Sequence, residues 1–170
     1  YDQWRQSGLT GWSYADVLPY FRRSEGYRGK DETFHGQDGP LVVEDSPLDS
    51  VAYDSFIKSG EQAGYPYTPD FNGAQQEGFG LYQVTQKDGE RWSAARAYVE
   101  PKRGSKNLDV RIGVSVQRLV IKDGRVTGVT YSVGDKERTV TARGAVVLSA
   151  GAFNTPQLLM LSGIGPAAHL

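Results

Sequence analysis

The sequence contains no cysteine, only two histidines and a single methionine among its 170 residues. Without cysteine the chain cannot form a disulfide framework, a thiolate zinc site or a cysteine nucleophile. The two histidines, His35 and His169, are far apart in the sequence, and the carboxylates are scattered along the chain. Since structural metal sites draw on clustered ligands of these types, we expect no metal site.

The sequence also has no excess of one charge: it contains 19 basic and 20 acidic residues, and its net charge is −1. A nucleic-acid-binding protein normally carries a clustered basic surface, so a nucleic-acid partner is not expected. No apolar run approaches the roughly 20 residues that span a bilayer. We therefore expect no transmembrane segment, and a location in the cytoplasm or at the periphery of a membrane.

The chain also lacks an initiator methionine, a signal-like apolar stretch and a polar tail. It starts at Tyr1 and stops at Leu170, in both cases within sequence of ordinary composition. We therefore expect both ends to lie inside a longer protein. With 21 glycines and 8 prolines, turns should be frequent between the elements.

Capping and breaker residues predict two helices in the first part of the chain. Ser13 precedes an acidic third residue, Asp16, which is close to a capping box and predicts a helix start. Pro19 lacks a backbone N–H, so we expect it to open a second turn rather than to lie inside that helix. Residues 49–63 have apolar side chains at helical spacing, and Gly64 is suited to end that helix.

Loops and short strands are predicted for most of the remaining sequence. The polar, glycine-rich stretch 26–40 predicts a surface loop of the length that often forms a lid or a binding loop. Alternation, turn residues and apolar content predict the other elements. They are a strand at 41–43, an aromatic loop at 65–73, a strand at 79–85, a turn at 87–89, a helix at 93–99, a strand at 108–112, a hairpin of 116–121 and 126–133 with its turn at Asp123-Gly124, and a third strand at 138–142.

The last third ends with an apolar strand, a corner of small residues and a helix. Residues 145–148 form an unbroken apolar run of the kind that is buried on both faces of a parallel sheet. Small residues at 149–152 let a ligand approach the backbone. Thr155 as N-cap and Pro156 as first residue predict a helix that continues to residue 161. Such an arrangement is typical of a nucleotide-binding α/β fold, but an ordinary strand-to-helix connection has the same spacing, and spacing alone favours that simpler interpretation.

The identity of the residues in this corner carries more information than their spacing. From Gly151 to Gly165 the chain reads GAFNTPQLLMLSGIG, which resembles the second signature of the glucose-methanol-choline (GMC) oxidoreductase family at every constrained position. Stretches between Tyr1 and Leu108 resemble the same family in the same order. They include Ser24-Glu25, Phe34-His35-Gly36 and Asp70-Phe71-Asn72-Gly73. The resemblance is nearest to the branch that holds bacterial choline dehydrogenase and related alcohol dehydrogenases.

This resemblance implies a mixed α/β fold that joins part of a Rossmann-like FAD-binding domain to part of a substrate-binding domain and a β-meander. We expect a helical segment with a lid-like loop around His35 at 1–40, part of the substrate-binding domain at 41–100 and part of the FAD-binding domain at 101–170. The implied cofactor is FAD. The resemblance places the backbone of Val116 at the adenine, and Ser149, Ala150 and Gly151 beside the ADP portion.

The implied reaction is the oxidation of a CH–OH group, in which a choline-like or primary alcohol becomes an aldehyde. The electrons removed from the alcohol would pass to oxygen, a quinone or another acceptor. The family's Gly-rich fingerprint and its catalytic histidine do not match any residue here. We therefore predict no catalytic residue in this chain, no activity of the chain alone, and weak or no retention of FAD by it. We interpret His35 as a solvated or loop-fixing residue rather than a general base.

Two other functions stay open on the sequence alone. One is a non-catalytic scaffold or interaction domain that keeps the fold without the flavin. The other is an NAD-dependent dehydrogenase of Rossmann type, which a flavin bound to the full-length protein would exclude.

Overall fold

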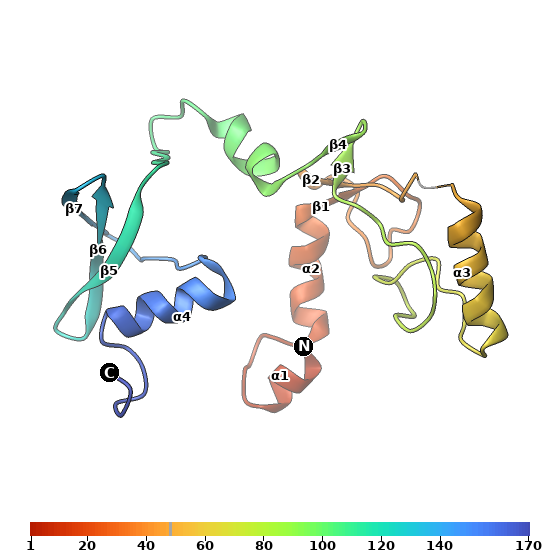
Figure 1. Ribbon diagram of the computed structural model, residues 1–170, viewed down its shortest axis with the longest axis horizontal. Coiled ribbons are helices and arrows are strands. Elements are labelled where there is room, and N and C mark those ends of the chain that lie inside the picture. Colours follow the sequence, from red (N-terminus) through yellow and green to blue (C-terminus); the bar gives the residue numbers. More distant parts are fainter. Residues whose placement is uncertain (48) are drawn as a thin grey trace. The chain divides into compact units, whose positions relative to one another are not determined.

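The computed structural model describes residues 1–47 and 49–170. The chain divides into two compact units, Tyr1–Leu108 and Asp109–Leu170 (Figure 1), and each is described by itself. Among the described residues, no helix combines the length and the apolar character that crossing a membrane requires.

The first unit consists of short elements joined by longer loops. Two strands pair in parallel, with Glu25 opposite Leu41, and a second pair is antiparallel, with Lys87 opposite Glu90. In chain order the elements are α1 (Asp2–Gln6), α2 (Tyr14–Ser24), β1 (Glu25–Tyr27), β2 (Leu41–Val43), α3 (Val51–Gln62), β3 (Gln86–Lys87), β4 (Glu90–Arg91), the π-helical turn η1 (Ala95–Val99) and the 3-10 turn η2 (Glu100–Lys102).

Helix α2 begins with the capping box that the sequence predicts. The Ser13 hydroxyl accepts from the Asp16 backbone N–H at 3.2 Å, and the Asp16 carboxylate accepts from the Ser13 N–H at 3.0 Å. The separate turn expected at Pro19 is wrong, because α2 continues through Pro19 to Ser24. Proline inside a helix costs about 3 kcal/mol. The capping box at one end, and Phe21 packed 5.7 Å from the Tyr1 ring beyond Pro19, help to stabilise the continuous helix.

We expect Ser13→Ala to destabilise α2 by about 1 kcal/mol, because the Asp16 N–H loses its side-chain acceptor. Hydrogen exchange of the α2 amides should then quicken by roughly fivefold, and that rate is the measurement. Ser59→Ala is the control, because within the described residues the Ser59 hydroxyl binds only the carbonyl of Ser55 in its own helix. Equal exchange in both variants would contradict the capping role.

Helix α3 agrees with the prediction for residues 49–63. Ser50 caps its start by accepting from the Ala52 N–H at 3.3 Å, and Gly64 follows its end with a φ of +90°. The strand predicted at 79–85 is wrong. With the residues that the structure describes, that segment makes two isolated bridges, in which Phe79 lies opposite Tyr67 and Val84 opposite Glu44. Its backbone groups are therefore paired with two separate segments, and no continuous ladder forms.

The turn predicted at 87–89 is confirmed as the tip of the β3–β4 hairpin. Asp88 and Gly89 have φ values of +53° and +80°, the left-handed pair that a tight hairpin turn needs. The helix predicted to end before Pro101 is partly wrong. A π-helical turn over Ala95–Val99 runs directly into a 3-10 turn over Glu100–Lys102, and Pro101 lies in that second turn.

The second unit is a three-stranded antiparallel meander with one helix packed on it (Figure 1). Its elements are β5 (Ser115–Lys122), β6 (Arg125–Val133), β7 (Lys136–Thr141) and α4 (Gly151–Leu161). The predicted hairpin is confirmed, and its turn residues Asp123 and Gly124 have φ values of +51° and +74°. Leu119, Tyr131 and Leu158 are its buried apolar side chains, so the core lies between the sheet and α4.

Two strands predicted in this unit are wrong. Residues 108–112 are irregular, and Arg111 there binds Asp109 at 2.7 Å and also contacts Tyr131. Residues 145–148 do not form a strand, and Val147 is 83% exposed. An apolar run needs neighbouring strands to accept its backbone hydrogen bonds, and no described strand lies beside this one.

Candidate functional site

The residues predicted to border a cofactor lie at the start of α4. Ser149 and Ala150 are exposed, and Gly151 is the first helical residue. Gly151 has a φ of +92°, which side-chain-bearing residues rarely adopt, and a Cβ placed there would meet no atom within 4 Å. The backbone at this corner is therefore open to an approaching group.

Thr155 stabilises this corner, although not in the predicted way. The helix starts at Gly151 and contains Pro156, so the prediction of Thr155 as N-cap and Pro156 as first residue is wrong. The Thr155 hydroxyl instead accepts from the Ala150 N–H at 3.1 Å, just before the first turn. The following first-turn N–H groups have no acceptor within a helix, an arrangement suited to an anionic group.

The fourth predicted residue, Val116, lies near the start of β5. It pairs with Tyr131 on β6 and is 45% exposed. Because the strand order is β5-β6-β7, β5 is an edge strand, and its outer backbone groups have no partner strand among the described residues. All four predicted residues thus belong to the second unit and are accessible. An open backbone corner, a helix start and a strand edge without a neighbouring strand in the described residues fit the ADP portion of a dinucleotide.

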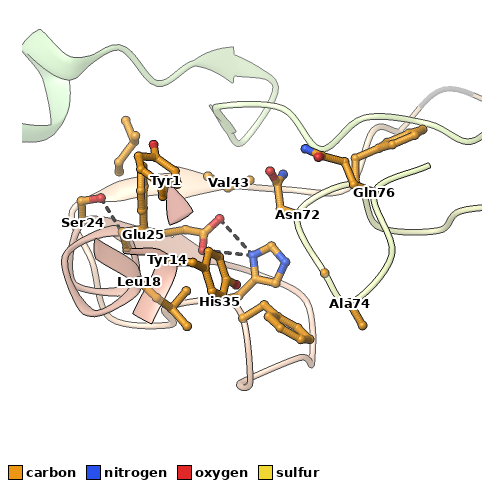
Figure 2. Close-up of a pocket in the computed structure, with 15 residues that line it drawn as sticks. Tyr1, Tyr14, Leu18, Ser24, Glu25, His35, Val43, Asn72, Ala74 and Gln76 are labelled. Atoms are coloured by element: carbon orange, nitrogen blue, oxygen red, sulfur yellow. Dashed lines mark hydrogen bonds and ion pairs between the residues drawn. The ribbon is translucent and has the colours of Figure 1, made fainter. Parts of the chain in front are cut away.

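In the first unit, His35 is held between two carboxylates. Its Nδ1 lies 3.0 Å from each Glu25 oxygen (Figure 2), and its Nε2 lies 2.9 Å from Asp70 Oδ2. The side chain is only 1% exposed, so the prediction of a loop-fixing histidine is confirmed over that of a solvated one. Arg22 Nε donates to the His35 carbonyl at 3.2 Å, which ties the same residue to α2.

The surroundings of His35 favour its protonated form. Burial of the ring opposes the charge, but the hydrogen bonds to Asp70 and Glu25 outweigh burial and raise the pKa above its usual 6.5. A protonated imidazole donates from both nitrogens, as two carboxylate partners require. With both nitrogens engaged, His35 has no free position from which to take a proton from a substrate.

Tyr27 covers one face of the His35 ring, with centroids 4.3 Å apart. Its hydroxyl donates to Asp45 at 2.7 Å, and burial, followed by this bond, raises the pKa of Tyr27 to about 12. Gln83 donates to Asp70 Oδ1 at 3.2 Å. The Gly36 N–H donates to Glu25 Oε2 at 3.1 Å. These contacts fix the orientation of both carboxylates and of the ring between them.

A cavity of about 710 Å³ opens beside this cluster (Figure 2). That volume is within the range of small-molecule pockets. The walls are largely aromatic and apolar, and they include Tyr1, Tyr14, Leu18, Phe21, Phe34 and Phe71. The amides of Asn72 and Gln76 lie on the opposite wall from Leu18, and Glu25 and His35 bring the only charged side chains among the residues that line it.

The His35 cluster does not form a metal site. Its carboxylates lie on opposite ring nitrogens and cannot converge on one ion, and no group of three or more such ligands occurs among the described residues.

The family model for GMC oxidoreductases matches residues 1–170, which is the entire chain. The chain belongs to the GMC oxidoreductase family. This finding confirms the resemblance seen in the run from Gly151 to Gly165. Membership of the family implies FAD as the cofactor, as the sequence predicted.

Bacterial relatives of this GMC oxidoreductase chain are similar along its whole length. The oxygen-dependent choline dehydrogenases of Sinorhizobium medicae and Sinorhizobium fredii are 46% and 47% identical to it over 170 residues, and that of Brucella ovis is 45% identical. The alignments cover 100% of this chain and 31% of each relative. The chain thus spans about a third of the length of these relatives.

Two solved structures share the fold of this GMC oxidoreductase chain. Pyridoxine 4-oxidase from Mesorbium loti superposes with a TM-score of 0.86 at 30% identity, over 99% of this chain and 33% of its own. An FAD-dependent oxidoreductase from Chaetomium thermophilum gives a TM-score of 0.90 at 24% identity, over 99% and 32%. The predicted mixed α/β fold with part of an FAD-binding domain is therefore confirmed.

The sequence did not identify the partners of His35. Glu25 and Asp70 are separated from it by 10 and 35 positions, so no local pattern links them. Both do occur in stretches that resemble the family, and an acidic residue in such a stretch is the one signal that could have found them.

Proposed function

We propose that the protein containing this chain is an FAD-dependent oxidoreductase that converts a choline-like or other primary alcohol to an aldehyde. The observation that supports this most strongly is the 45–47% identity, over all 170 residues, to proteins named oxygen-dependent choline dehydrogenase. Because the chain covers 31% of those proteins, the proposal concerns the whole protein and not these residues alone.

In this proposal the second unit holds part of the cofactor. Ser149, Ala150 and Gly151 border the ADP portion at the start of α4, and the backbone of Val116 meets the adenine. The open corner at Gly151 and the position of β5 at the edge of the sheet support this assignment. The bound flavin would supply the hydride acceptor for the alcohol carbon, while a base takes the hydroxyl proton. We assign that base to no residue of this chain, since His35 is bound on both nitrogens.

The test is purification of the full-length protein followed by release and quantification of its cofactor. We expect about one FAD per chain, and we expect choline to bleach the visible flavin absorbance when oxygen is excluded, because the alcohol gives up two electrons. Pyridoxine, a simple primary alcohol and the uncharged choline analogue 3,3-dimethylbutan-1-ol serve as the comparison substrates. Readmitted oxygen and an added quinone then identify the electron acceptor by the rate at which the absorbance returns.

The alternatives give different results in this experiment. A protein without flavin would support a non-catalytic scaffold. Oxidation that depends on added NAD would support a Rossmann dehydrogenase. Bleaching by pyridoxine but not by choline would contradict the choline-like substrate and retain the flavin chemistry.

A further inference from the structure

Ser162, the residue that follows the last turn of α4, bridges this helix to strand β5. Its hydroxyl accepts from the Leu119 N–H at 2.8 Å and donates to the Leu158 carbonyl at 2.6 Å. Leu119 and Leu158 are 6% and 9% exposed, so the bridge lies at the buried contact between the helix and the sheet. One hydroxyl therefore satisfies a strand donor and a helix acceptor together.

The strand needs this partner because of its position in the sheet. β5 is an edge strand, and the Leu119 N–H faces away from β6 toward α4. A buried N–H without an acceptor would cost the desolvation of that group. The pairing of β5 with β6 also shifts register on both sides of Leu119, between Val116 and Arg118 and between Val120 and Ile121. The Ser162 bond thus anchors the short regular section between two irregular ones.

The same two elements carry the residues proposed to border FAD. Val116 lies three positions before Leu119 on β5, and Gly151 opens the helix that Ser162 follows. A helix is a rigid connection, so fixing one end of α4 against β5 also constrains the other end. We propose that Ser162 is a positioning residue, which holds the start of α4 and the Val116 edge of β5 in the arrangement that FAD requires. The inference rests on the proposed function.

The experiment measures the FAD dissociation constant of the full-length apoprotein by the change in flavin fluorescence. Ser162→Ala should raise it by about fivefold, as expected for the loss of one net hydrogen bond. Ser162→Thr retains a hydroxyl and should restore binding to within about twofold of the wild type.

Ser55→Ala is the matched control. The Ser55 hydroxyl also donates to a carbonyl four residues earlier, that of Val51 at 2.7 Å, and in the described residues it has no bond to another element. The FAD affinity of Ser55→Ala should equal that of the wild type. If Ser162→Ala does not fold, Ser162→Cys decides the question, because a thiol fills the space but is a weak hydrogen-bonding group. Ser162→Cys should then bind FAD more weakly while retaining its far-UV circular dichroism.

Three results would overturn the inference. An FAD affinity unchanged in Ser162→Ala, together with a lower unfolding temperature, would make the bridge purely structural. Equal weakening in Ser162→Ala and Ser162→Thr would show that the hydroxyl is not responsible. A wild-type protein that binds no FAD would overturn the proposed function itself, whereas in the first two results the wild type still binds the cofactor.

Discussion

Gly36→Ala is expected to lower the free energy of unfolding of the first unit by about 3 kcal/mol or more, which is the upper range for overpacking a close contact. A Cβ at Gly36 would lie 1.7 Å from the Arg22 carbonyl oxygen and 2.7 Å from that of Glu25. Both neighbours are backbone atoms, so neither can rotate away as a side chain could. The chain around β1 would have to move.

The same movement would disturb the hydrogen bonds that hold the loop. The Gly36 N–H donates to Glu25 Oε2 at 3.1 Å, and its carbonyl accepts from the Tyr27 N–H at 2.7 Å. Hydrogen exchange should therefore quicken across residues 25–43, while the amides of the second unit exchange as in the wild type. This local measurement separates a packing defect in one unit from general unfolding.

Gly144→Ala is the control for this variant. A Cβ at Gly144 meets no atom within 4 Å and its φ is outside the left-handed region, so its effect on stability should stay within about 1 kcal/mol. If Gly36→Ala unfolds at the same denaturant concentration as Gly144→Ala, Gly36 does not pack closely against α2.

The sequence predicted best those features that depend on a few neighbouring residues. The capping box of Ser13 and Asp16 spans four positions, and the turns at Asp88 and Asp123 depend on a residue that tolerates positive φ beside a glycine. Such signals include both partners of the interaction within one short stretch. The structure therefore agrees with them almost residue by residue.

The predictions that failed depended on partners elsewhere in the chain. The run 145–148 is apolar enough for a buried strand, but its sequence does not specify a neighbouring strand, and Val147 is 83% exposed. Pro19 and Pro156 were expected to begin helical turns and instead lie inside helices. Proline's local penalty is the same in any helix interior, whereas the contacts that offset it depend on how the helix packs, and a short stretch of sequence does not show them.

The features of the candidate site also differ in whether they are formed by residues that are close in the sequence. The corner at Gly151 could be found from sequence because its residues are contiguous and match a family signature. The Ser162 bridge joins residues 43 positions apart, and the His35 cluster joins three separate segments. Hydrogen-bond partners at such separations are brought together only by the fold.

The largest electrostatic effect is expected from His35→Gln, which should cost about 3 kcal/mol of stability because it leaves Glu25 and Asp70 without the cation between them. Glutamine fills part of the space and its NH2 group can donate hydrogen bonds, but it carries no charge. Thermal unfolding of the full-length protein at pH 6 is the measurement. A loss of less than about 1 kcal/mol would contradict the imidazolium between two carboxylates.

The stability of the wild type should also depend on pH, because the charge on His35 does. Since the folded protein raises the pKa of His35 above 6.5, the stabilisation is fully present below pH 6.5 and is lost as the pH rises through the raised pKa. The charged groups around the ring are Glu25 from β1, Asp70 from the 65–85 loop, Arg22 from α2 and Asp31 from the loop before His35. The unfolding temperature of the wild type should therefore fall between pH 6 and pH 9, and that of His35→Gln should fall much less.

Asp70→Asn should give an intermediate slope, because one carboxylate still faces the ring and the raised pKa moves back toward 6.5. Asp109→Asn is the matched control: it removes one acidic charge from an exposed pair with Arg111 in the other unit and should leave the slope unchanged. If the wild type and Asp70→Asn lose stability in parallel above pH 6.5, the pH dependence of stability comes from groups other than His35. In that case the two carboxylates do not keep His35 protonated.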